Sequence, residues 1–412
     1  MSMGTINRAA LLILLVVAPV YWVPGVSISL FSLVKVAIFA SIVGCFVLYI
    51  LMEKKSLRIL RDPVLLLLLT LLVIVFFRTL FTDDIINSLS LFLRYFLAPV
   101  LVFVVTYNVL NTKTYAARMA KAIAAPVIIM VAYTLLLKFR VIEPFPIPSS
   151  YFQNLPERMS LSFGRGAFAV SVALSLPFLV GMTVQLYKKR RAAWIGGLAL
   201  NVFLLITIVN TLARSAFVAA LLGTGVVIYS LSKRLAVFLV VIMALLIGLI
   251  YAPQSTSWFR IGTGAETFTS GRIYLYEAAI SMIEDHLITG VGLGRYSVEA
   301  RKYFMGKSAL KYSSSQPHNL FLWIASENGI LAGVLSFLFV ALITWKVVAL
   351  AVKLHSMLLA SFAGSIVAGS ALSLVDAGII FSTLYLTIPW WVSVAVVLKC
   401  TKMNRITLHD KS

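Results

Sequence analysis

Two stretches decide the fold of this chain, TSGRIYLYEAAISMIEDHLITGVGLGRY at residues 269–296 and QPHNLFLWIASENGILAG at residues 316–333. Apolar runs of about twenty residues, the length that a helix needs to cross a bilayer, lie before and after them. The first stretch carries Arg272 and the second carries His318. We therefore expect two polar side chains just outside a bundle of membrane-spanning helices.

The composition indicates a polytopic integral membrane protein. Of the 412 residues, 61% are hydrophobic and only 12% are charged, and the apolar runs recur from end to end. We expect an all-α fold of about twelve transmembrane helices in one polytopic domain, residues 1–412. The expected spans are 9–23, 27–51, 62–77, 87–110, 121–137, 166–186, 192–210, 213–231, 235–252, 318–346, 355–375 and 378–399. Cys45 and Cys400 lie far apart in or beside apolar runs, so neither a disulfide nor a zinc site is expected.

The basic residues predict the orientation. Twenty of the 35 Lys and Arg residues fall in the two termini and in every second connection, which is the bias of cytoplasmic loops. Both termini should therefore be cytoplasmic. The same bias accounts for the net charge of +21, so a nucleic-acid partner is not needed to explain it. The alternative is that the inner loops bind a polyanion.

Two of the outer connections are long, 138–165 and about 251–318. Long ordered loops in compact proteins usually carry function, so the active surface should be built from these two. We expect residues 253–330 to form the outer catalytic loop within the single domain.

The second long connection contains a predicted amphipathic helix from Arg272 to Asp285. Four residues recur at helical spacing on its expected apolar face: Ile273, Tyr276, Ile280 and Ile283. The glycines Gly290, Gly292 and Gly294 should end the helix in a turn. No strand precedes this G-x-G-x-G pattern, so a dinucleotide-binding fold is excluded.

The apolar sequence after His318 is too long for one span. It continues to Trp345, about 28 residues or roughly 42 Å of helix, against a bilayer core of about 30 Å. Asn328 and Gly329 supply a natural break. We expect a short outer helix that begins at Pro317 and His318, with His318 directed into the outer site.

Three cations within or between the spans are further candidates. Arg214 lies between two closely joined spans, Lys35 lies in the outer third of the second span, and Arg94 lies in the fourth. A guanidinium at such depth is costly unless it faces a polar cavity or a partner. Three separate segments would thus bring Arg214, Arg272 and His318 to one face. The alternatives are a snorkelling Arg214, a solvated Arg272 and a His318 that caps its helix.

This combination of motifs resembles the bacterial O-antigen ligase, polymerase and protein O-oligosaccharyltransferase superfamily. The resemblance covers roughly 210–335: an Arg on a span-to-span turn, a second Arg opening a helix that ends in G-x-G-x-G, and P-H-N followed by E-N-G-I-x-x-G. Family members often have Trp four residues after the second Arg, where this chain has the aromatic Tyr276. The resemblance implies a GT-C-like glycosyltransferase of the bacterial inner membrane. Its glycan donor would be linked to undecaprenyl pyrophosphate, and its active site would lie on the periplasmic face.

The residue types suit that chemistry. Arginines are bidentate donors that stabilise a departing pyrophosphate, which is the expected role of Arg272 and Arg214. A histidine with a near-neutral pKa can accept the proton of an acceptor hydroxyl, which is the expected role of His318. Six further residues are expected to bind substrate: Arg94, Lys35, Tyr276, Arg295, Arg301 and Glu327. No cofactor or metal is expected, and Asp83 and Asp84 form a lone acidic pair that we expect to be solvated.

Four functions remain in view. The preferred one is ligation of O-antigen to the lipid A core oligosaccharide, with inversion and without a metal. An O-antigen polymerase would use the same donor with a second carrier-linked glycan as acceptor, and a protein O-oligosaccharyltransferase would use a protein. A transporter is disfavoured because the sequence shows no matched pair of broken helices, and because the charges gather outside the spans.

Overall fold

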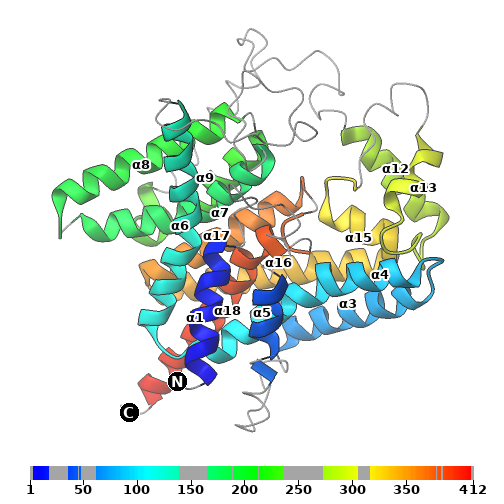
Figure 1. Cartoon of the computed structure of the whole chain (residues 1–412), viewed down its shortest axis with the longest axis horizontal. Helices are drawn as coiled ribbons and strands as arrows, with labels where there is room; N and C mark the ends of the chain where they lie inside the picture. The colour runs from blue at the N-terminus through cyan, green and yellow to red at the C-terminus, as the bar shows by residue number, and fades with distance from the viewer. Residues whose placement is uncertain are drawn as a thin grey trace.

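The structure is a computed structural model, and it describes residues 3–17, 36–44, 46–47, 62–138, 165–187, 189–211, 213–235, 272–304, 316–376, 378–381 and 384–409. Helices make up most of these residues, and none of the described residues forms a strand. The predicted all-α class is confirmed. Figure 1 shows long helices packed side by side, with the short helices α12, α13 and α15 grouped at one end of the bundle and the start of α1 near the end of α18.

The helices follow one another in the order α1 (Met3–Val17), α3 (Pro63–Leu80), α4 (Ile85–Leu91), η2 (Phe92–Leu97), α5 (Ala98–Val109), α6 (Lys113–Lys138), α7 (Arg165–Leu186), α8 (Arg191–Asn210), α9 (Arg214–Leu231), α12 (Arg272–Asp285), α13 (Tyr296–Tyr303), α15 (Leu320–Asn328), α16 (Ile330–Lys353), α17 (Met357–Ser373) and α18 (Leu384–His409).

Eight helical segments of the described part are long and apolar enough to cross a membrane, and two shorter apolar helices, Thr5–Val17 and Met357–Ser373, accompany them. The chain is therefore a polytopic helical membrane protein. All of the predicted span 235–252 except Leu235, and most of 27–51, lie outside the described residues. The count of twelve stays a prediction.

Helices α7, α9 and α17 pack with their backbones in close contact. A Cβ at Gly223 of α9 would lie 2.5 Å from the carbonyl oxygen of Gly364 of α17, so only glycine fits there. A Cβ at Gly364 would meet Pro177 of α7, and one at Gly181 would meet Ser361. Residue numbers therefore increase along α7, from Pro177 to Gly181, where they decrease along α17, from Gly364 to Ser361. These two helices are antiparallel. Small residues at such crossings are typical of helix packing in membranes.

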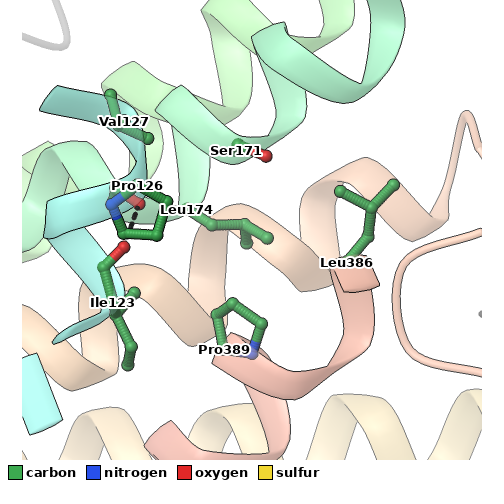
Figure 2. A pocket seen from close by; sticks show the side chains of 8 residues that line it. Ile123, Pro126, Val127, Ser171, Leu174, Leu386 and Pro389 are labelled. Atoms are coloured by element: carbon green, nitrogen blue, oxygen red, sulfur yellow. Dashed lines mark hydrogen bonds between the residues drawn. The ribbon is translucent and has the colours of Figure 1, made fainter. Parts of the chain in front are cut away.

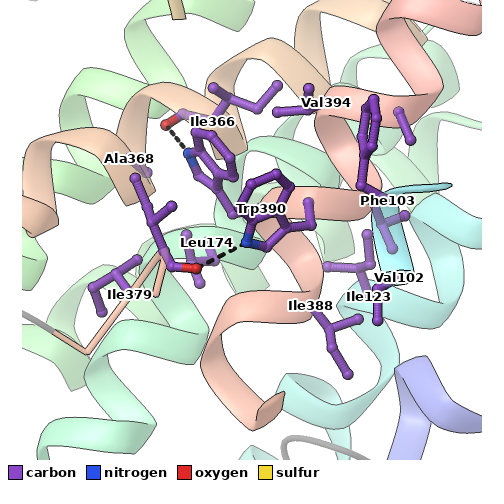
Figure 3. Packing of buried hydrophobic residues seen from close by; sticks show 14 of the residues in the cluster. Val102, Phe103, Ile123, Leu174, Ile366, Ala368, Ile379, Ile388, Trp390 and Val394 are labelled. Carbon is purple, nitrogen blue, oxygen red and sulfur yellow. Dashed lines mark hydrogen bonds between the residues drawn. The ribbon is translucent and has the colours of Figure 1, made fainter. Parts of the chain in front are cut away.

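Two tryptophans of α18 bind α17 and the segment that follows it, and Figure 3 shows Trp390 beside Ile366. The Nε1 atom of Trp390 donates to the carbonyl of Ile366 at 3.2 Å, and Nε1 of Trp391 donates to the carbonyl of Ile380 at 2.8 Å. Both rings are fully buried. Because indole N–H groups need a partner when buried, the Trp390 bond ties α18 to α17 and the Trp391 bond holds the 379–381 segment against α18.

A small pocket lies between α6, α7 and α18 (Figure 2). Its lining is mostly apolar and consists of Ile123, Pro126, Val127, Ser171, Leu174, Ser175, Leu386 and Pro389. Proline cannot donate a backbone hydrogen bond, so helices loosen beside it. Here the hydroxyl of Ser175 donates to the carbonyl of Ile123 at 3.1 Å. The pocket has no titratable group and therefore no means of acid or base chemistry.

The helix from Ile85 to Val109 contains a π-helical turn, η2. The amide of Ala98 donates to the carbonyl of Leu93, five residues earlier, and Pro99 follows directly. Because Pro99 has no N–H and its ring crowds the preceding turn, the helix widens before it. The widened turn carries Arg94, whose side chain is exposed.

Two local predictions around the long outer connection are confirmed, and two need correction. The amphipathic helix spans Arg272–Asp285 as expected, and the long apolar run breaks at Gly329, between α15 and α16. The predicted apolar face was wrong at Ile280, which is 46% exposed. The buried stripe is instead Leu275, Ala278, Ala279, Met282 and Ile283. The short helix begins at Leu320 rather than at Pro317, because Asn319 is its N-cap.

Candidate active site

His318 lies just before α15 in a left-handed backbone conformation, with φ of 52°. This conformation is uncommon for a residue with a Cβ, and such strain gathers at functional sites. Asn319 holds it in place from both directions. Its Oδ1 accepts from the amides of Phe321 and Leu322, each at 3.0 Å, and its Nδ2 donates to the carbonyl of Leu374 at 2.8 Å. The start of α15 is thereby tied to the end of α17.

Asp376 follows α17, and its negative charge raises the pKa of both His318 and Tyr276. Burial lowers the pKa of His318, the negative charge of Asp376 opposes that shift, and the positive charge of Arg272 adds to it. Burial also raises the pKa of Tyr276, which accepts a side-chain hydrogen bond from Arg272. Three segments, namely α12, the start of α15 and the end of α17, thus bring Arg272, Tyr276, His318 and Asp376 into one electrostatic group.

This group can perform general-base chemistry. A histidine whose pKa is lowered from 6.5 stays neutral at physiological pH and can accept a proton. The guanidinium beside it can donate hydrogen bonds to a leaving oxygen. Asp376 is the carboxylate whose negative charge raises the pKa of both His318 and Tyr276.

The G-x-G-x-G segment is clamped against the break between α15 and α16. The amides of Val291 and Gly292 donate to the carbonyls of Ser326 and Glu327, each at 2.9 Å. A Cβ at Gly290 would lie 2.3 Å from the carbonyl carbon of Glu327. Gly290 has φ of 60° and Gly292 has φ of 102°, a region that glycine adopts easily. These glycines therefore allow the backbone of the loop to lie directly against the end of α15.

The side chain of Glu327 adds two more hydrogen bonds between α15 and the glycine loop. It is 1% exposed, and its two oxygens accept from the amides of Gly294 and Tyr296, each at 2.9 Å. Burial raises its pKa to about 7, against the opposing effect of these hydrogen bonds. Glu327, predicted as a substrate-binding residue, is therefore a buried carboxyl group whose oxygens are engaged by the backbone.

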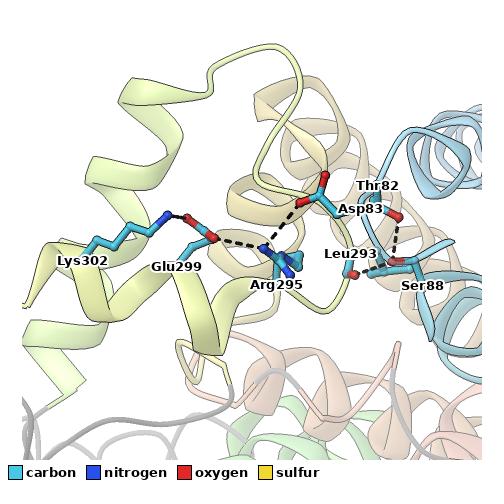
Figure 4. A network of polar contacts seen from close by, with 7 residues as sticks. All are labelled: Thr82, Asp83, Ser88, Leu293, Arg295, Glu299 and Lys302. Carbon is cyan, nitrogen blue, oxygen red and sulfur yellow. Dashed lines mark hydrogen bonds and ion pairs between the residues drawn. The ribbon is translucent and has the colours of Figure 1, made fainter. Parts of the chain in front are cut away.

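A second polar network holds the same loop from its other face (Figure 4). The hydroxyl of Ser88 donates to the carbonyl of Leu293 at 2.9 Å, and Arg295 pairs with Asp83 at 3.6 Å and with Glu299 at 3.4 Å. Arg295, predicted to bind substrate, is thus occupied by two carboxylates. Its ion pair with Asp83 modifies our expectation that the acidic pair is only solvated.

Asp84, the second member of that pair, is a helix N-cap. Its carboxylate accepts from the amide of Asn87 at 3.1 Å at the start of α4. Its role in the described structure is therefore local. No group of three or more His, Cys, Asp or Glu residues suited to a metal occurs within the described ranges.

Arg214 begins α9, and its side chain is exposed. Helix α9 packs against α17 at Gly223, which lies nine residues after Arg214 and meets Gly364. The approach of Arg214 to Arg272 and His318 stays a prediction.

The remaining candidates are less well defined. Arg94 is exposed on η2, whose neighbouring Phe96 stacks on Trp323 of α15 at a ring distance of 6.2 Å. Arg301 is exposed on α13. Lys35 lies outside the described residues. Tyr296 is a structural residue that the sequence did not single out, because an aromatic residue after a glycine turn has no distinctive pattern.

Fold and site together define a polytopic membrane protein with a histidine, an arginine and a carboxylate gathered at one end of its bundle. Residues 199–337 are similar to the family model described as O-antigen ligase. The matched segment contains Arg214, Arg272 and His318. No curated protein matches the chain. This match agrees with the resemblance carried by the sequence motifs.

Proposed function

We propose that this protein is an O-antigen ligase that joins a glycan from undecaprenyl pyrophosphate to the lipid A core oligosaccharide. The observation that carries the proposal is the group formed by Arg272, His318 and Asp376. Arg272 and His318 lie within the segment that matches the O-antigen ligase model. His318 is the base of this group and Arg272 is its cation. Glycan transfer from a pyrophosphate requires a base for the acceptor hydroxyl and a cation for the leaving group.

The proposed reaction is a single displacement. The acceptor hydroxyl forms a bond to the anomeric carbon of the donor while the bond from that carbon to the pyrophosphate oxygen breaks. His318 takes the hydroxyl proton, and Arg272 and Arg214 donate hydrogen bonds to the departing pyrophosphate, which leaves on its polyprenyl carrier. One displacement inverts the configuration at the anomeric carbon. The charge that a metal would neutralise elsewhere is neutralised here by guanidinium groups, so the proposed chemistry is metal-independent.

The proposed setting is the periplasmic face of the bacterial inner membrane, in a GT-C-like enzyme with both termini in the cytoplasm. The exposed residues Arg94 and Arg301, together with Lys35, are proposed to attract the anionic donor or nearby headgroups. Tyr276 is proposed to contact substrate through its ring and its hydroxyl. Membrane lipid would surround the carrier tail, because a long polyprenyl chain leaves lipid only at high cost.

A pair of reactions with purified protein tests the proposal. Carrier-linked glycan is supplied either with lipid A core, the acceptor of a ligase, or with a second carrier-linked glycan, the acceptor of a polymerase. We expect product with lipid A core, of inverted anomeric configuration. Product only with the second carrier-linked glycan would assign the polymerase, and transfer to a protein acceptor alone would assign a protein O-oligosaccharyltransferase.

A further inference from the structure

Arg272 and His318, the proposed catalytic pair, lie on two segments of the chain that are 46 residues apart in the sequence. Arg272 begins α12, and His318 precedes α15. We propose that Glu327 is a positioning residue that fixes Arg272 relative to His318, acting through Tyr296. This inference rests on the proposed function, since it presumes that Arg272 and His318 work together.

The first contact of this path joins α15 to α13. Glu327 lies in the last turn of α15, and its two oxygens accept from the amides of Gly294 and Tyr296 at 2.9 Å. These amides belong to the start of α13, where N–H groups have no partner within the helix. Removing an acceptor here would leave a buried N–H unsatisfied, at a cost of about 1–3 kcal/mol. The carboxylate therefore sets where α13 begins.

The second contact joins α13 to α12. Tyr296 is 0% exposed, and its hydroxyl donates to the carbonyl of Leu275 at 2.8 Å. Leu275 lies three residues after Arg272, less than one helical turn away, and it is itself 3% exposed. A shift of the Tyr296 ring would thus move the first turn of α12, the turn that carries Arg272.

The other end of α15 is held independently. Asn319 ties its first turn to Leu374 at the end of α17, close to Asp376. Helix α15 therefore has one end at His318 and the other at the carboxylate that sets α13. Because a nine-residue helix keeps a fixed length, it acts as a spacer between the base and the support of Arg272.

Packing alone does not explain a glutamate at this position. A buried carboxylate is costly to desolvate, and apolar residues of similar volume often give equal or greater stability. Glutamate can instead accept two hydrogen bonds with the same geometry at once. Glutamine has only one acceptor oxygen, so its amide NH₂ would face one of the two backbone N–H groups. The carboxylate thus provides a connection that an isosteric neutral side chain cannot provide.

The test compares Tyr296→Phe and Glu327→Gln with the matched control Ser88→Ala. The control removes the hydrogen bond that Ser88 donates to Leu293 at 2.9 Å on the opposite face of the same loop, together with the one that it accepts from Thr82 at 3.0 Å, and it leaves the path to Arg272 intact. Turnover is measured against pH with purified protein, carrier-linked glycan and lipid A core. Thermal unfolding shows that each variant is folded. Tyr296→Phe keeps the buried ring, so it gives a result even if Glu327→Gln fails to fold.

We expect Tyr296→Phe to reduce turnover roughly ten- to hundredfold, because small displacements of a catalytic group have effects of that size. The charged groups whose fields change the pKa of His318 are Asp376, after α17, and Arg272, on α12. If Arg272 moves away, its lowering effect on the pKa of His318 weakens. The acidic limb of the pH profile should then shift to higher pH in Tyr296→Phe, while Ser88→Ala keeps the wild-type limb.

The outcomes separate this inference from the proposed function. A loss of turnover with an unshifted limb, or effects equal to those of Ser88→Ala, would reduce Tyr296 and Glu327 to structural residues and overturn the inference. Wild-type activity in Arg272→Lys would instead overturn the proposed role of Arg272, and the inference would fall with it. A shifted limb in Tyr296→Phe, with Arg272→Lys inactive, supports both.

Discussion

Replacement of Gly329 by alanine should break the contact between the glycine loop and α15. Gly329 separates α15 from α16 with φ of 90° and ψ of 160°, a conformation that is essentially restricted to glycine. A Cβ there would lie 2.1 Å from the carbonyl oxygen and 2.7 Å from the carbonyl carbon of Ile288. Both atoms belong to the backbone, so they cannot turn aside as a flexible side chain could.

The expected cost follows from these contacts. The unfavourable backbone conformation costs about 1–3 kcal/mol, and overpacking against backbone adds about 1–3 kcal/mol. The amide of Ile330 donates to the carbonyl of Leu287 at 2.9 Å, and it would lose this partner as the two backbone segments move apart. Alanine regains about 0.4–1 kcal/mol through the lower entropy of the unfolded chain. We therefore expect Gly329→Ala to lower the free energy of unfolding by about 2–5 kcal/mol.

Thermal unfolding of the purified protein in detergent measures this effect, together with the rate of glycan transfer. The matched control is Gly225→Ala in α9, where a Cβ would meet nothing within 4 Å. Alanine in a helix interior is favoured over glycine by about 0.5–1 kcal/mol, so the control should be neutral or slightly stabilised. If Gly329→Ala unfolds at the same temperature as Gly225→Ala and transfers glycan at the wild-type rate, the proposed contact between loop and helix is wrong.

Three further predictions concern the chemistry. Arg272→Lys and Arg214→Lys keep the charge but lose the planar fork, so each should lose most of its transfer activity at normal protein level; a wild-type rate in either purified variant would leave that arginine without a catalytic role. Wild-type turnover should rise with pH along an acidic limb whose midpoint lies below 6.5, because burial lowers the pKa of His318 and only its neutral form accepts a proton. Asp376→Asn should move this midpoint lower still, since the Asp376 charge raises that pKa, and a midpoint that rises would contradict the arrangement. EDTA should leave the rate unchanged; inhibition by EDTA that Mg²⁺ reverses would disprove the metal-independent mechanism.

The elements of the site were predictable because their causes are local. Arg272 follows Thr269 and Ser270 and precedes an apolar helical pattern, and Gly329 interrupts a run too long for one span. Both features survive in the structure as the start of α12 and the break before α16. The face that α12 buries was harder to predict. Small residues such as Ala278 and Ala279 are buried there while Ile280 is exposed, because the helix packs closely on its neighbours.

The roles of Glu327 and Arg295 depend on contacts between distant parts of the chain. Glu327 binds amides 31 and 33 residues earlier. Ser88, which holds the same loop as Arg295, reaches a carbonyl 205 residues later. Sequence spacing carries no information about such pairs. From the sequence alone, a charged residue that stabilises the fold cannot be distinguished from one that binds substrate. His318 could be singled out because it follows a proline beside an apolar run, whereas its neighbour Asp376 acquires a role only from the fold.

The most direct test of the central claim is the transfer rate of purified His318→Ala with carrier-linked glycan and lipid A core, measured together with its affinity for the carrier-linked glycan. If His318 takes the acceptor proton, the variant should bind the donor nearly as the wild type does, because donor binding resides in the arginines and the surrounding lipid, and transfer should be abolished. Full transfer activity in His318→Ala would contradict the account.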